Sequence, residues 1–108
     1  MTIIKMLLYM RLSENISKAE YVQFLDETID LFRLQNNSGY DELCSTILEQ
    51  LLDIKENVVE LEVLSEWDEI NERYTLGGLA IRNFDENDEL GLRVQEVFWG
   101  ALKFGEMQ

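Results

Sequence analysis

The chain has 108 residues, a formal net charge of −13 at pH 7 and 46% hydrophobic residues. This length fits a single domain (residues 1–108) with one modest core, and the hydrophobic content is too high for a disordered chain. The strong negative charge argues against nucleic acid or an anionic lipid surface as a direct ligand, because both would be repelled.

The first segment, residues 1–12, is apolar but short, and Lys5 and Arg11 interrupt it. It is too short to span a bilayer and no small-residue cleavage site follows, so we expect neither a membrane anchor nor a signal peptide. Its apolar spacing predicts a first helix, with a turn at residues 13–15. The lone Cys44 cannot form an internal disulfide, which indicates a reducing compartment. We therefore expect a cytoplasmic protein.

A second helix begins with a capping box. The side chain of Ser17 can accept from the N–H of Glu20, while the Glu20 carboxylate reaches back to the serine N–H. Apolar residues then recur at three- and four-residue spacing, which predicts an amphipathic helix that ends at residues 36–39. Its apolar stripe consists of Val22, Leu25, Ile29 and Phe32.

A third helix follows, capped by Ser38 or Asp41, and an uninterrupted helix from 40 to 72 would be unusually long for a small domain. We expect one break, because Asn57 and Ser65 both resemble later capping sites. Spacing favours helix for the section after residue 57, although Val59, Leu61 and Val63 also alternate as in a strand. The third helix presents on one face Leu43, Ile47, Leu51 and Ile54.

The last part of the chain predicts a turn and a closing helix. Gly77 and Gly78 indicate a turn, and residues 85–88 supply caps and negative charge to the start of the final helix. The core stripe of that helix is Leu90, Val94, Val97, Phe98, Ala101 and Leu102. The sequence thus predicts an all-α fold, a small bundle of four to five helices joined by short loops.

Catalytic and metal sites find little support. The chain has no histidine, which excludes histidine-based triads and histidine zinc sites, and acidic neighbours disfavour a thiolate at Cys44. Residues 85–96 superficially resemble a calcium loop, but Leu90 occupies the position of the turn glycine and Arg93 adds a positive charge. A helix cap explains this stretch better. We expect no enzyme activity, no metal and no cofactor.

The most informative feature is an acidic run in the middle of the chain. Between Asp41 and Glu72 there are eleven acidic residues and one basic residue, Lys55, which gives a local charge of −10. Such runs are usually solvated helix faces, but a solvated face normally intersperses both signs. This imbalance favours a functional negative surface that binds a basic partner.

Aromatic residues accompany the acidic run. Trp67 is either a core residue of a short helix or an exposed anchor among carboxylates, and Tyr74 is a second anchor candidate. The predicted partner-binding residues are Asp53, Glu56, Glu60, Glu62, Glu66, Trp67, Asp68 and Glu69.

The layout resembles bacterial immunity proteins against nuclease toxins, most closely those of the colicin D type. The resemblance lies in the apolar segment 3–12, the turn 13–17 that enters a helix with Glu, Tyr and Phe, and the stretch 83–90 that leads into the closing helix 93–104. Residues 57–82 depart from that layout, and no inhibitory residue is transferred. The resemblance implies a short helical protein that plugs the basic substrate groove of a tRNA-cleaving toxin.

The leading hypothesis is therefore a non-enzymatic immunity protein that occludes the basic active site of a nuclease. A phage-type nucleic-acid mimic that disables a host defence nuclease would present the same surface, and gene neighbourhood would separate the two. A helical regulatory or scaffolding module, whose charge is incidental, is the third alternative. It predicts binding that is insensitive to salt.

Overall fold

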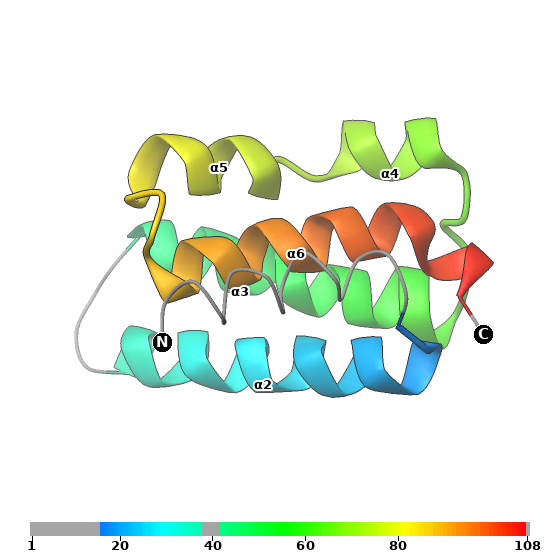
Figure 1. The fold of residues 1–108 in the computed structure, drawn as a ribbon, viewed down its shortest axis with the longest axis horizontal. Coiled ribbons are helices and arrows are strands. Elements are labelled where there is room, and N and C mark those ends of the chain that lie inside the picture. Colours follow the sequence, from blue (N-terminus) through cyan, green and yellow to red (C-terminus); the bar gives the residue numbers. More distant parts are fainter. Residues whose placement is uncertain (1–15, 38–41, 108) are drawn as a thin grey trace.

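A computed structural model describes residues 16–37 and 42–107 (Figure 1). Within these residues the structure is helical and has no strand, which confirms the all-α prediction. Residues 57–82 form no hairpin, but the chain is non-helical at residues 61–66 and 74–75, between η1, α4 and α5. The predicted first helix and the caps Ser38 and Asp41 lie outside the described residues. The elements are α2 (Lys18–Asn37), α3 (Glu42–Ile54), the π-helix η1 (Lys55–Glu60), α4 (Trp67–Arg73), α5 (Leu76–Asn83), α6 (Glu89–Lys103) and the 3₁₀-helix η2 (Phe104–Glu106).

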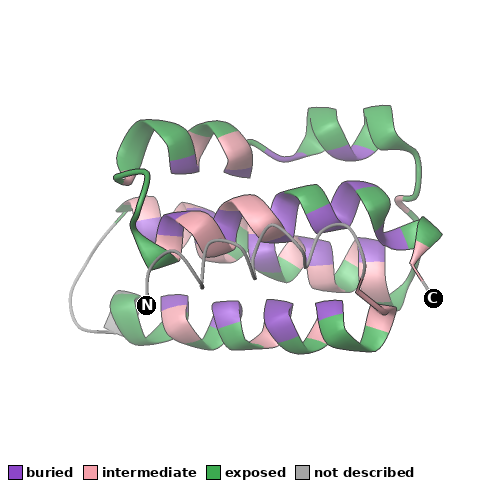
Figure 2. Cartoon of the chain, in the orientation of Figure 1, coloured by how far each residue is buried: buried purple, intermediate pink, exposed green. Residues whose placement is uncertain are grey.

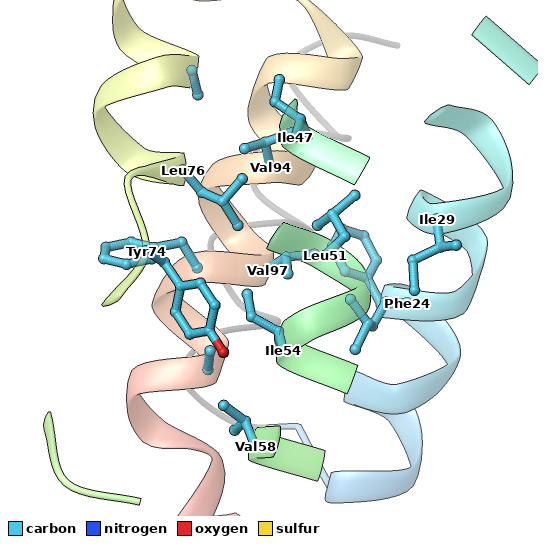
Figure 3. Packing of buried hydrophobic residues seen from close by; sticks show 14 of the residues in the cluster. Phe24, Ile29, Ile47, Leu51, Ile54, Val58, Tyr74, Leu76, Val94 and Val97 are labelled. Atoms are coloured by element: carbon cyan, nitrogen blue, oxygen red, sulfur yellow. The ribbon is translucent and has the colours of Figure 1, made fainter. Parts of the chain in front are cut away.

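The described helices pack around α6. It contacts α2, α4 and α5, while α3 contacts α2 and α5. Figure 1 shows α4 and α5 one after the other along one side of α6, with α2 on the opposite side. The buried residues of these outer helices lie on the faces turned toward α3 and α6 (Figure 2). Figure 3 shows aliphatic and aromatic side chains of the successive helices meeting in one cluster.

The capping box of α2 forms as predicted. The N–H of Glu20 donates to Ser17 Oγ at 3.1 Å, and the N–H of Ser17 donates to Glu20 Oε1 at 3.2 Å. Leu25, Ile29 and Phe32 are buried, so the spacing of the sequence identifies the core face correctly. Helix start and core face are both fixed by local sequence here.

α3 and η1 form one continuous helical stretch that ends at Glu60. The expected break falls at residues 61–66, but Asn57 was predicted wrongly as a cap, because it lies inside η1. Its amide donates to the Asp53 side chain at 3.1 Å and to the Asp53 carbonyl at 3.3 Å, so its hydrogen bonds serve the same helix. α4 then begins one residue later than Ser65 predicts, with Glu66 at the N-cap and no side-chain cap bond.

The predicted turn at Gly77 and Gly78 is also wrong, because both glycines lie in the first turn of α5. A Cβ on Gly77 would lie 3.3 Å from Cδ2 of Phe98 on α6, so this glycine permits close packing of the two helices. The first hydrogen bond of α5 joins the N–H of Leu79 to the carbonyl of Thr75 at 2.9 Å, so the helix already includes both glycines. Packing against α6 therefore outweighs the tendency of two consecutive glycines to form a turn.

The start of α6 agrees with the sequence. Oδ1 of Asp88 accepts from the N–H groups of Leu90 at 2.8 Å and Gly91 at 3.4 Å, which makes Asp88 the N-cap. The predicted stripe is buried from Val94 to Leu102, and Leu90 is partly buried. Arg93 lies beside α2, where Nη1 donates to Thr28 Oγ1 at 3.1 Å and the guanidinium lies over the Phe24 ring.

Candidate interaction surface

The predicted site residues from Glu56 to Glu69 lie at one end of the bundle, near the start of α2 and the end of α6 (Figure 1). Backbone hydrogen bonds at the C-terminal end of η1 hold the chain that follows it in place. The N–H of Leu61 donates to the Glu56 carbonyl at 2.8 Å, and the Asn57 carbonyl accepts from Val63 at 2.9 Å and Leu64 at 3.1 Å. These bonds fix the chain between η1 and α4, so the acidic segment has a defined backbone path.

Glu62 lies at the point where the chain reverses after η1, and its φ of 52° is in the left-handed region. Helices commonly end with a residue in this conformation, and glycine is the residue that adopts it without steric cost. The Glu62 carboxylate forms a 3.9 Å ion pair with Lys18, but both side chains are exposed, so the pair contributes little stability. A strained glutamate therefore occupies a position that glycine would fill better.

We expect Glu62→Gly to raise the free energy of unfolding by about 1 kcal/mol, because it removes the strain of the left-handed backbone. Glu62→Ala is the matched control, since it removes the same carboxylate but keeps a Cβ, and it should bring no gain. Urea unfolding followed by circular dichroism measures both. Equal stability of the two variants would contradict the strain at this residue.

Five carboxylates of the predicted site are exposed and form no ion pair within the part of the chain that the structure describes: Glu56, Glu60, Glu66, Asp68 and Glu69. Three nearby cations pair with carboxylates outside this set of five: Lys18 with Glu62, Lys55 with Asp26 on α2, and Arg73 with Asp53. With Glu62, these residues leave the end of the bundle strongly negative, and the arrangement can attract a cationic ligand.

Asp53 belongs to a different structure, an internal clasp between α3 and the α4–α5 joint. Its carboxylate accepts from Arg73 Nε at 2.7 Å, Arg73 Nη2 at 2.9 Å and the Tyr74 hydroxyl at 2.6 Å. One turn earlier, Gln50 Oε1 accepts from the N–H of Thr75 at 2.8 Å. Asp53 therefore fixes the joint, and its oxygens are occupied by internal partners.

The pKa values of two members of the clasp, Asp53 and Tyr74, are shifted. Hydrogen bonds from Arg73 hold the pKa of Asp53 below its ordinary value, more strongly than burial raises it. The pKa of Tyr74 is raised, first by burial and then by its bond to the Asp53 carboxylate. Tyr74 is buried, so this second anchor candidate faces the core, and of the two anchor candidates only Trp67 is exposed.

Three large apolar residues are exposed within the segment from Glu56 to Glu69: Leu61 at 59%, Val63 at 63% and Trp67 at 51%. Sequence reasoning places Trp67 among the site residues but treats Leu61 and Val63 only as parts of a helix or strand pattern. The sequence offers only a weak signal for them: Leu61 lies between Glu60 and Glu62, but its spacing from Val58 and Leu64 also fits the apolar face of a helix.

Among the described residues, no group of three His, Cys, Asp or Glu side chains could hold a metal ion. Cys44 is buried in the core. No helix described here is both long enough and apolar enough to cross a membrane.

Comparison with protein-family models gives no match, and comparisons with curated proteins and with solved structures give none either. The function has to be inferred from the chain's own residues.

Proposed function

We propose that this protein is a non-enzymatic inhibitor, an immunity protein that neutralises a basic nuclease toxin, an RNase or tRNase, by occluding its active-site groove. One observation supports this function above the others. The segment from Glu56 to Glu69 combines five exposed carboxylates that have no ion pair in the described structure with a backbone held by hydrogen bonds.

The physical reason is the charge of the proposed target. A nuclease holds a phosphate backbone with lysine and arginine side chains. Carboxylates presented to the same groove would occupy the positions of phosphates and exclude the substrate. Long-range attraction also raises the rate of encounter, which matters because a toxin has to be captured before it cuts RNA.

The proposed contact residues are Glu56, Glu60, Glu62, Glu66, Trp67, Asp68 and Glu69. Asp53, which sequence reasoning places in the same set, has its carboxylate bonded to Arg73 and Tyr74. We propose that it acts indirectly, because it holds the end of α4 and the α4–α5 joint against α3. Within the described residues, Glu62 forms only the exposed 3.9 Å ion pair with Lys18 and the remaining five carboxylates form no ion pair, so they can meet a partner directly.

Joint replacement of Glu66, Asp68 and Glu69 by lysine is expected to slow association with the cognate nuclease at least about tenfold at low salt and to abolish protection. The nuclease is to be sought first in the gene directly upstream. Stopped-flow mixing measures the association rate, which should fall for the unaltered protein as salt is raised.

The matched control replaces Asp30, Asp85 and Glu86 by lysine. These residues are exposed and lie outside the Glu56–Glu69 segment, and the net charge changes by the same amount. Association of the control triple should slow far less. An equal fall in association rate for both triple variants would show that only net charge matters. An association rate of the unaltered protein that does not change with salt concentration would exclude electrostatic capture.

A further inference from the structure

We infer that Leu61, Val63 and Trp67 form an apolar anchor within the acidic surface, and that the partner is a basic protein face with an apolar pocket among its lysines and arginines. This inference rests on the proposed function, because it assumes that the acidic surface meets a basic protein. It adds the chemistry that would hold the complex together once the charges have brought it to contact.

The exposure of these three side chains is the first argument. All three lie within seven consecutive residues and are at least half exposed, whereas the neighbouring Leu64 is partly buried against the core and Ile70 is fully buried. Single exposed apolar residues are ordinary on protein surfaces, but exposed apolar surface rimmed by polar residues is typical of interaction sites, and these three residues are interspersed with carboxylates.

The backbone that presents the anchor is held in place, which is the second argument. The N–H of Val63 donates to the Asn57 carbonyl at 2.9 Å, and Ile70 attaches α4 to the core one turn after Trp67. A side chain presented by a fixed backbone loses less conformational freedom on binding than one on a free loop. These contacts suit Leu61, Val63 and Trp67 to insertion into a preformed pocket.

Charge complementarity selects the kind of partner. Glu60 and Glu62 flank Leu61, while Glu66 and Asp68 flank Trp67, so any surface that covers these apolar side chains also meets carboxylates. A nucleic acid, an anionic lipid surface or a second copy of this chain, with its charge of −13, would be repelled. A polar cationic surface would satisfy the glutamates but would leave the apolar groups in water.

The two kinds of residue have separate kinetic roles. Exposed carboxylates at the rim mainly raise the association rate, whereas apolar groups that become fully buried mainly lower the dissociation rate. Loss of the anchor should therefore shorten the life of a complex and leave its rate of formation nearly unchanged. Loss of the carboxylates should have the opposite pattern.

Two synthetic helical peptides of about 18 residues, about five turns, test the anchor without knowledge of the toxin. One contains lysine with a leucine stripe, and the other has glutamine in place of every leucine, so their charges are equal. Titration calorimetry gives the affinities. In a Trp99→Phe variant, the emission of Trp67 reports its burial.

We expect the leucine peptide to bind about tenfold or more tightly than the glutamine peptide and to shift the emission of Trp67 to shorter wavelength. Joint replacement of Leu61 and Val63 by serine should remove most of this difference. The matched control replaces Leu34 and Ile81 by serine, because these side chains are 68% and 71% exposed and lie outside the segment. The control should keep the full difference.

Three outcomes would overturn the anchor: equal affinity of the unaltered protein for both peptides, an equal loss in the control pair, or self-association that the Leu61→Ser and Val63→Ser double variant abolishes. Its failure is separable from failure of the proposed function. Nuclease inhibition with an unchanged dissociation rate in this double variant would reject the anchor alone. Peptide discrimination without inhibition of any nuclease would support the anchor and reject the immunity role.

Discussion

Replacement of Gly100 by alanine is expected to lower the free energy of unfolding by about 3 kcal/mol, because the added methyl group has no room. A Cβ at this position would lie 2.3 Å from Cε1 and 2.7 Å from Cδ1 of Tyr21. The Tyr21 ring cannot move away easily, since its hydroxyl donates to the Val97 carbonyl at 2.6 Å and the ring also contacts Phe104. Overpacking therefore outweighs the better helix propensity of alanine.

Gly78→Ala is the matched control, since it makes the same substitution within a helix. A Cβ on Gly78 would meet only the end of the flexible Arg82 side chain, at 3.6 Å. Here we expect a gain of about 0.5–1 kcal/mol from helix propensity. Urea unfolding at neutral pH measures both variants. The same sign of change for the two would contradict the packing of α2 on α6.

Asp53→Ala is expected to cost about 2 kcal/mol of stability, because it removes the carboxylate that joins α3 to the α4–α5 joint. The largest part of the loss comes from the Tyr74 hydroxyl, which is left at the edge of the core without its 2.6 Å acceptor. Asp68→Ala is the control, since this exposed side chain has no ion pair in the described structure, and its effect should stay within about 0.5 kcal/mol. Equal effects of the two substitutions would show that the clasp contributes nothing.

The contribution of Asp53 should also depend on pH. Arg73 donates to the folded-state carboxylate and lowers its pKa below the ordinary value of 3.8. A lowered folded-state pKa contributes stability that is present above the unfolded pKa and is lost as pH falls through the folded value. The difference in stability between the unaltered protein and Asp53→Asn should therefore be largest near neutral pH and shrink below about pH 4. Unfolding curves at several pH values measure it, and a constant difference would argue against the ion pair.

The negative charge of the candidate site follows from the sequence, whereas the internal partners of its carboxylates do not. The charge imbalance of the middle segment is a property of composition, so the exposed Glu56, Glu60 and Glu66 follow from it. The distinction between those residues and Asp53 does not, because Asp53 is bound by Arg73 and Tyr74, which lie 20 and 21 positions further along the chain. Spacing within one helix carries no information about such a partner.

The sequence by itself determined the helical class, the start of α2 at its Ser17–Glu20 capping box, the cap of α6 within residues 85–88 and the apolar faces that form the core. These features depend on residues within one or two helical turns, so local chemistry is sufficient. Only the tertiary structure decided that Gly77 lies inside a helix against Phe98, that Tyr74 points inward, and that Leu61 and Val63 remain exposed. Each of these outcomes depends on the space that another helix leaves, and that space is set by packing between distant segments.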